Sequence, residues 1–274
     1  MEHKMITLFC LIDEFLKSIQ YNDHPLSHIS NSEVLFLGYL AVNDFNGNYT
    51  KAHSYAMALS LVNKIEYSRF TRRLNKLEDI IEQLFHYVST IFMRLNDVQV
   101  YSVDSFPVEI CKIEREKSVR LWQDSSMKGY NASKKRYFYG FKVHMCVTTD
   151  QEPVLFYITE GSMHDVTASY KFLPNLPQNS IVIGDKGYVS NPLETFLAGF
   201  GIQLSPLHRK NMPKDNEHGL KRKIRKGVET AFSVITSKFG KVIKATSIGG
   251  FLVKLKLFIL AYSLDMLFKS LSFN

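Results

Sequence analysis

Apolar residues recur at helical spacing through the first 95 residues. Five apolar side chains between residues 5 and 19 fall on one side of a helix with 3.6 residues per turn. Residues 32–45 repeat this pattern, with an Asn or Ser cap before them and an Asn-Gly stop after them. We therefore predict an all-helical N-terminal region, with helices near residues 5–19, 32–45, 51–62 and 68–92.

The pattern changes from helical to alternating at Asn96. Residues 98–108 combine β-branched and aromatic side chains, which is typical of a strand, and Pro107 ends the run. Residues 137–149 and 153–159 have the same character, and the short turn between them predicts a hairpin. Shorter strands are predicted at residues 180–184 and 202–205, and helices at residues 192–199, 222–239 and 250–269.

This order of elements predicts an α/β fold (α+β mixed), in which helices flank a mixed sheet. We place the domain boundary at the change of pattern. Residues 1–95 then form a helical N-terminal region, and residues 96–274 form a second domain that includes the C-terminal helix.

The chain carries a formal charge of +8 and has a pI near 9.2. This excess favours a polyanionic partner, nucleic acid before an acidic membrane, although a basic protein can also be basic merely for solubility. Its three cysteines are far apart and form no CxxC pair, which argues against a disulfide framework or a thiolate zinc site. With no apolar stretch long enough to span a bilayer, we expect a soluble cytoplasmic protein with no membrane partner.

Three acidic residues lie at positions where a site is expected. Asp104 is inside the first predicted strand, where an ionised carboxylate is costly unless a cation or a metal pairs with it. Asp185 directly follows a wholly apolar strand, where open α/β sheets place ligand sites. Glu229 lies at the edge of the buried side of a helix, and Arg225 and Lys226 precede it by about one turn.

Three converging carboxylates would repel one another and raise their own pKa values, and divalent cations remove that repulsion. Oxygen ligands alone suit Mg²⁺ or Mn²⁺, and two such ions stabilise in-line displacement at phosphorus. Less specific interpretations remain open. With 26 acidic residues, some trio falls near strand ends by chance, Asp185 can be a turn residue, and Glu229 can pair with Arg225 alone. Three histidines in suggestive places, His144, His164 and His208, are more typical of structural roles.

Basic residues are concentrated in three segments. A cluster at the start of residues 68–92 fits a DNA-binding head of helix-turn-helix type, although a solvated helix face is the commoner case. Residues 112–136 and 208–226 are also polar and strongly basic. Trp122, in the first of these two, is more typical of packing than of base stacking.

Six blocks in order resemble a known family: DSFPVEICK, GYNASKKRYFYGFKVH, GSMHD, GDKGY, PLHRKN and RKGVETAFSVI. Together they resemble the bacterial insertion-sequence DDE transposases, most closely the insertion-sequence family numbered nine hundred and eighty-two. The resemblance is dense over residues 96–265 and looser in the N-terminal part. It implies an RNase H-like catalytic core with Asp104, Asp185 and Glu229 as a triad that holds two Mg²⁺ or Mn²⁺ ions. Asp104 would be the ligand shared by both ions, and Asp165 is a reserve acid.

The resemblance further implies a DNA transposase that binds the terminal inverted repeats of its element as a homodimer. The triad would cleave a strand at the element end and then transfer it to target DNA, with no small-molecule substrate. The residues that we expect to contact DNA are all cationic: Lys210, Arg222, Arg225, Lys226, Arg72, Arg73, Lys134 and Lys135.

This sequence departs from the family around the glutamate. Related transposases carry a Tyr-Arg-Glu-Lys signature, of which Arg225 matches the arginine, whereas Arg222 and Thr236 stand where tyrosine and lysine would be, with Lys238 two residues later. Two alternatives stay open: an RNase H-like metal-dependent nuclease without strand transfer, and an inactive remnant that only binds DNA. A carboxylate-pair hydrolase acting on sugars fits the basic charge poorly.

Overall fold

The computed structural model describes residues 2–119, 123–132, 134–208, 216–239 and 243–272. Within it the chain forms two compact units, Met1–Tyr87 with Ile235–Asn274, and Val88–Val234. The predicted division into functional domains at residues 95 and 96 remains a prediction. The compact units are divided differently, because the C-terminal helix packs with the N-terminal helices.

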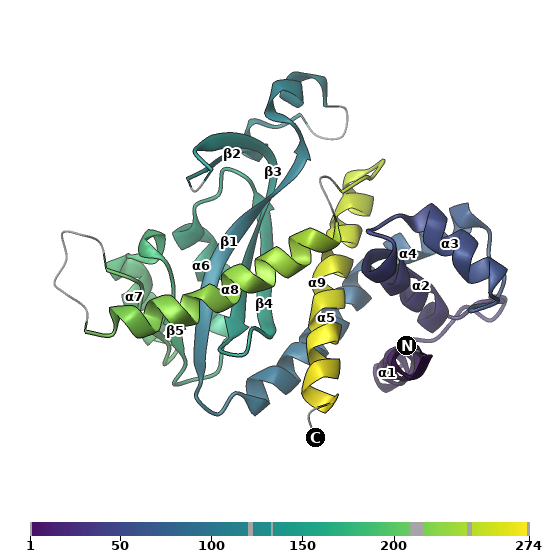
Figure 1. Cartoon of the computed structure of the whole chain (residues 1–274), viewed down its shortest axis with the longest axis horizontal. Coiled ribbons are helices and arrows are strands. Elements are labelled where there is room, and N and C mark those ends of the chain that lie inside the picture. The colour runs from purple at the N-terminus through teal and green to yellow at the C-terminus, as the bar shows by residue number, and fades with distance from the viewer. Residues whose placement is uncertain (1, 120–122, 133, 209–215, 240–242, 273–274) are drawn as a thin grey trace. The chain divides into compact units, whose positions relative to one another are not determined.

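The first unit is helical, as the apolar pattern predicts (Figure 1). Its central helix, α2 (Asn31–Asp44), is buried along most of its length, and Gly38 lets it approach its neighbours closely. A Cβ atom at Gly38 would lie 2.9 Å from a methyl group of Leu74 and 3.5 Å from one of Leu257. The other helical segments are α1 (Glu2–Ser18), α3 (Tyr49–Ala58), α4 (Tyr67–Lys76), residues 78–87 of α5 (Glu78–Leu95), residues 235–238 of α8 (His218–Lys238) and α9 (Ile248–Ser272).

Two details of this unit differ from the predicted pattern. The helix expected over residues 68–92 is two helices, since α4 ends at the cap residue Leu77 and a new first turn with Glu78 and Asp79 begins α5. Helix α2 is capped by Ser30, whose hydroxyl accepts from the amide of Glu33 while the Glu33 carboxylate accepts from the amide of Ser30.

Arg73 of α4 is bound within this unit. Its guanidinium donates to the hydroxyl of Ser27 (2.5 Å), the carbonyl of Ile29 (2.7 Å) and the side-chain oxygen of Asn31 (2.6 Å). These contacts fasten the connection between α1 and α2 to α4. Arg72, the other arginine predicted to contact DNA here, is exposed to solvent.

The second unit is built on a six-stranded mixed sheet with the strand order β2-β3-β1-β5-β6, in which β4 pairs with β3. Strands β1, β3 and β4 are antiparallel to their neighbours in this set, whereas β5 runs parallel to β1 and β6 runs parallel to β5. The predicted fold class, a mixed sheet with flanking helices after an all-helical region, is confirmed, and its RNase H-like character remains a prediction. The strands are β1 (Val100–Cys111), β2 (Lys128–Asn131), β3 (Arg136–Thr148), β4 (Pro153–Glu160), β5 (Ile181–Ile183) and β6 (Gln203–Leu204).

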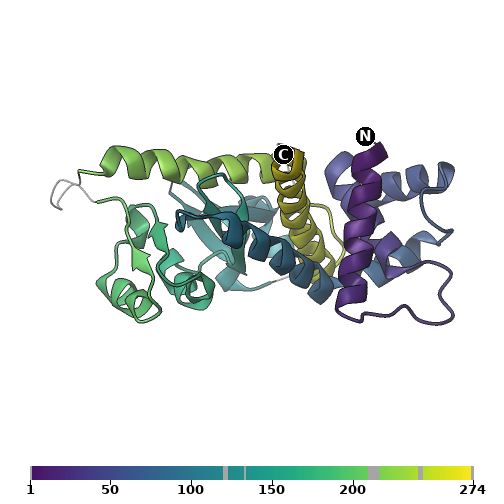
Figure 2. The ribbon, with the colours of Figure 1, turned by 90° about the horizontal axis from the view of Figure 1, so that it is seen from below.

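Helices cover both faces of this sheet (Figure 2). Helix α8 lies on one face, where Phe232 packs on Phe106 of β1 with ring centroids 4.5 Å apart. Helices α6 (Asp165–Phe172) and α7 (Asn191–Ala198) lie on the other face, where Phe172 packs near the buried His144 of β3. Residues of β1 before the register shift at Glu109 therefore alternate between the face that α8 covers and the face that α6 covers.

No helix among the described residues is both long enough and apolar enough to cross a membrane.

Candidate active site

Strand β1 carries Asp104 where one of its neighbours ends. β5 pairs with β1 only as far as Ser102, while on the other side β3 continues, with Met145 opposite Asp104. The backbone amide of Ser105 donates to Oδ1 of Asp104 (2.8 Å). The carboxylate is thus fixed at the carboxyl end of β5, on the face of the sheet that α8 covers.

Asp185 follows β5 directly and begins a tight 3-10 turn, Lys186–Tyr188. Its Oδ1 accepts from the backbone amide of Gly187 (2.7 Å). The turn interpretation of Asp185 therefore holds for one of its oxygens, and the other has no hydrogen bond among the described residues. Asp185 also lies close enough to Asp104 for its charge to act on that carboxylate.

Arg225 joins Glu229 to Asp104. One guanidinium nitrogen lies 2.7 Å from Oε1 of Glu229, one turn along α8, and another donates to Oδ2 of Asp104 (3.2 Å). The helix ion pair that was an alternative interpretation of Glu229 is therefore present. Through its second contact, Arg225 also connects Glu229 to Asp104, which lies 121 residues before Arg225 in the chain.

The environment of Asp104 raises the pKa of its carboxyl group to about 7. Burial is the largest cause, and the neighbouring carboxylates of Asp185 and Asp165 add to it. The Ser105 amide and the Arg225 guanidinium act in the opposite direction and do not compensate. Asp104, Asp185 and Glu229 are three carboxylates against the one guanidinium of Arg225, so the site holds more negative charge than that cation neutralises.

Several buried polar atoms without a hydrogen-bond partner belong to the strands, turn and helix that form this site. Among the described residues six such side-chain atoms occur, and four belong to Ser102, His144, Tyr188 and Arg225. Full burial of the Tyr188 ring raises the pKa of its phenol, and the charges of Asp165, Asp104 and Asp185 raise it further. Because an unpaired buried polar group costs about 1–3 kcal/mol, this grouping is typical of a functional site rather than of a packed core.

Asp165, the reserve acid, lies on the α6 side of the same strand. Its Oδ1 accepts from the hydroxyl of Ser105 (2.7 Å) and lies 3.4 Å from Nζ of Lys142 and 3.5 Å from Nδ1 of His144. The other ring nitrogen of His144 is hydrogen-bonded to Thr159 (3.0 Å), so this histidine has the structural role that the sequence favours. Asp165 thus holds Ser105 in place, and the backbone amide of Ser105 in turn orients the Asp104 carboxylate.

The predicted triad is brought together in part. Asp104 and Glu229 meet through Arg225, and Asp185 acts on Asp104 through its charge. Within the described part of the chain, no group of three His, Cys, Asp or Glu side chains stands as a set of metal ligands, because a guanidinium lies between two of the carboxylates. The metal site therefore remains a prediction.

The other cations predicted to contact DNA lie on two elements of this unit. Arg222 and Lys226 are exposed on α8, one turn apart, and Lys134 and Lys135 are exposed in the turn between β2 and β3. Lys210 and Trp122 lie outside the described residues.

Lys238, the described lysine nearest the expected position of the signature lysine, is bound within the first unit. Lys238, two residues after Thr236, donates within the first unit to Oδ1 of Asn43 (2.5 Å) and Oδ2 of Asp265 (2.8 Å). It is therefore a structural residue of the helical unit.

We expect Asp104→Asn to stabilise the metal-free protein at and above neutral pH. The folded-state pKa of about 7 lies above the ordinary value of 3.8, so the folded chain holds a proton that the unfolded chain has released, and stability falls as pH rises between about 4 and 7. The neutral amide removes this loss, on the order of 2–4 kcal/mol above pH 7. Thermal melts at pH 5 and pH 8 in a chelator measure it, with the exposed Asp150→Asn as control. Equal melting temperatures for Asp104→Asn and the wild type at pH 8 would contradict it.

Comparisons with known proteins identify the family of the chain. A family model described as "Transposase DDE domain" matches residues 95–239, more than half of the chain and all three predicted acids. No curated protein sequence matches the chain. Among solved structures, the chain is similar to the piggyBac transposase in a synaptic complex with hairpin DNA. That similarity has 11% sequence identity and a TM-score of 0.49, and it covers 96% of this chain and 72% of the other. On the family match, the chain belongs to the DDE transposases.

Proposed function

We propose that this protein is a DNA transposase that cleaves DNA at the ends of its element and joins the freed strand to target DNA, with Asp104, Asp185 and Glu229 as its catalytic carboxylates. The observation that carries the proposal is the meeting of Asp104 and Glu229 on one guanidinium, beside Asp185, within the residues that match the family. We further propose that it acts in the bacterial cytoplasm as a homodimer on paired DNA ends.

The donor set fits divalent cations. All three side chains offer carboxylate oxygens, which Mg²⁺ and Mn²⁺ prefer, and the charge around Asp104 exceeds what Arg225 neutralises. Asp104 would be shared between two ions, and Asp185 and Glu229 would hold one each. Such ions, when bound, supply charge stabilisation for displacement at phosphorus. The chain's own contribution is to hold the three carboxylates at one end of β5, with the Ser105 amide fixing the orientation of Asp104.

Arg225 has two roles in this proposal. Without a divalent cation it is the counter-ion that allows Asp104 and Glu229 to lie together, and its side chain is mostly buried while doing so. When the carboxylates are otherwise neutralised, its guanidinium becomes available for a DNA phosphate, which it matches in geometry. DNA then competes for the same side chain that the carboxylates hold.

The phosphate contacts come from cations in both units. Arg222 and Lys226 extend the exposed positive face of α8 beside Arg225, and Lys134, Lys135, Lys210, Arg72 and Arg73 are proposed as further contacts. Arg73 already uses its guanidinium for internal hydrogen bonds, so a phosphate would have to share it. Binding that rests on phosphates weakens steeply with added salt.

The proposal predicts Mg²⁺-dependent nicking of a duplex taken from the DNA at the ends of the element, followed by joining to a target plasmid. Asp104→Asn is expected to lower the nicking rate roughly 1,000-fold or more, whereas Asp150→Asn, an exposed carboxylate outside the site, is expected to leave it unchanged. Gel analysis of an end-labelled donor with an unlabelled plasmid measures both steps.

The same assay separates the alternatives. Nicking without joined product would favour a metal-dependent nuclease over a transposase. Salt-dependent binding without nicking would favour an inactive remnant. Equal nicking by Asp104→Asn and the wild type would show that Asp104 is not catalytic.

Arg225→Gln tests the counter-ion role. Removing the guanidinium leaves Asp104 and Glu229 without their cation, so we expect Mn²⁺ to bind the DNA-free protein more tightly, roughly fivefold, while DNA nicking falls. Lys226→Gln is the matched control, because Lys226 is an exposed neighbour on the same helix, and it is expected to weaken DNA binding only. Titration calorimetry with MnCl₂ measures the affinity. An unchanged Mn²⁺ affinity in Arg225→Gln would show that Arg225 does not compete for the carboxylates.

A further inference from the structure

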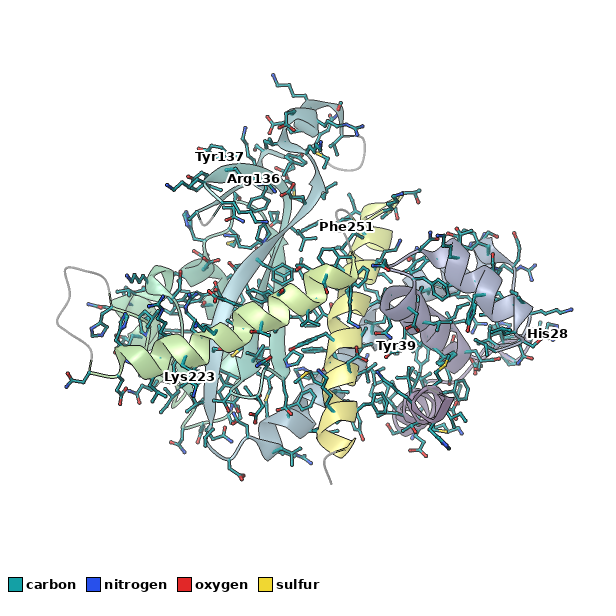
Figure 3. All side chains as sticks on the ribbon, in the orientation of Figure 1. His28, Tyr39, Arg136, Tyr137, Lys223 and Phe251 are labelled. Atoms are coloured by element: carbon teal, nitrogen blue, oxygen red, sulfur yellow. The ribbon has the colours of Figure 1, made fainter. Side chains whose placement is uncertain are left out.

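The hairpin formed by β2 and the start of β3 presents two tyrosine rings to solvent. Tyr130 and Tyr137 are directly opposite each other in the strand register, with ring centroids 5.1 Å apart at 61°. They are 53% and 56% exposed, although each belongs to a paired strand. Figure 3 shows Tyr137 next to Arg136, at the end of β3 that pairs with β2.

The segment that leads into this hairpin carries much of the positive charge of the protein. Residues 112–136 contain eight Lys or Arg against three Asp or Glu, a surplus of five, whereas the whole chain has a surplus of eight. Three of these cations, Lys134, Lys135 and Arg136, follow one another directly before Tyr137, and the ammonium of Lys128 lies 5.6 Å from the centre of the Tyr137 ring. Lys128 and Arg136 form ion pairs with Glu116 and Glu109, so the exposed Lys134 and Lys135 are the cations offered to phosphate here. Exposed aromatic rings beside such cations are typical of nucleic-acid binding.

The hairpin is held in place by close backbone packing. A Cβ atom at Gly129 would lie 2.2 Å from the carbonyl oxygen of Gly161, so only glycine fits between β2 and the segment after β4. The amide of Ser162 also donates to the carbonyl of Ser126 (2.9 Å), and the side chain of Asn131 accepts from the amide of Lys134 (3.0 Å). The tyrosines are therefore presented by a fixed ribbon, which lowers the entropy cost of binding.

The register places the tyrosine pair on the same face of the sheet as Asp104. Met145 lies opposite Asp104, and side chains two residues apart on β3 share a face, so Tyr137 and its partner Tyr130 belong to that face. Met145 is eight residues after Tyr137 on the strand, which corresponds to about 26 Å at about 3.3 Å per residue. At about 3.4 Å per base pair, this is the length of roughly eight base pairs.

We propose that the rings of Tyr130 and Tyr137 stack on an unpaired base of the DNA substrate, roughly eight nucleotides from the bond that the acidic site cleaves. The bases of an intact duplex keep their faces inside the stack, so exposed aromatic rings gain from DNA mainly where a base is unpaired. Lys134 and Lys135 bind the adjoining phosphates. This inference rests on the proposed function, because the acidic site must act on DNA for the distance to have meaning.

The test compares two DNA probes on the full-length Asp104→Asn protein, which the proposed function expects to bind DNA without cutting it. One probe is a 30-base-pair duplex, and the other is the same duplex with three unpaired nucleotides eight positions from the cleavage point. We expect Tyr130→Ser with Tyr137→Ser to weaken binding to the second probe tenfold or more and to leave binding to the first unchanged. The matched variant, Tyr130→Phe with Tyr137→Phe, keeps the rings and should keep the affinity. Lys134→Gln with Lys135→Gln should weaken binding to both probes and reduce the salt dependence of that binding.

Equal loss on both probes, or no loss, would overturn stacking on an unpaired base. Equal loss would mean that the hairpin contacts the duplex. No loss would mean that the two tyrosines stabilise the fold or bind a protein partner. Should the serine variant melt early, 5-iodouracil in the unpaired stretch provides a second measurement on the tyrosine-containing protein. Photocrosslinks at Tyr130 or Tyr137 support stacking, and crosslinks only elsewhere refute it. These results do not depend on cleavage, so stacking can fail while metal-dependent nicking by the wild type stands.

Discussion

The candidate site of the second unit depends on one electrostatic arrangement, a largely buried carboxylate that shares a single guanidinium with a second carboxylate. Asp104 lies in the central strand beside Asp185 and Asp165, and burial together with these charges makes its ionised form costly. Arg225 partly offsets that cost by binding Asp104 and Glu229 at once. A fold designed for stability alone would place an apolar residue at this position, since replacing a buried ion pair by apolar side chains is often neutral or stabilising.

The sheet provides this arrangement through unequal strand lengths. Strand β1 has twelve residues, but its parallel neighbour β5 has three, so β1 extends past the end of β5 and carries Asp104 beyond it. The turn that follows β5 begins at Asp185, whose carboxylate accepts from the backbone amide of Gly187. The absence of a side chain at Gly187 allows this close approach. Helix α8, anchored by Phe232 on Phe106, supplies Arg225 and Glu229 from above the same strand. The site therefore forms where β5 ends and β1 continues.

The sequence predicts most of the elements because their apolar patterns are long and regular. It does not predict β2, whose four residues, KGYN, show no alternation and are held by pairing with β3 and by the fit of Gly129 against Gly161. It also joins α4 and α5 into one helix, because the apolar pattern continues through Leu77, where the backbone turns. For the site, the spacing of Arg225 and Glu229 predicts their ion pair. Nothing in the spacing predicts that Arg225 also contacts Asp104, or that Ser105, Asp165 and Tyr188 lie near Asp104. Those contacts exist only once the sheet has formed.

The central claim is that Asp104, Asp185 and Glu229 act as one unit, and the most direct test is whether their effects on cleavage are additive. The nicking rates of Asp104→Asn, Asp185→Asn and Glu229→Gln would be compared with that of the triple variant under the same Mg²⁺ concentration. If the three carboxylates form one catalytic site, each single substitution lowers the rate nearly as far as the triple substitution does. A single variant that nicks at close to the wild-type rate would remove that residue from the site and contradict the account.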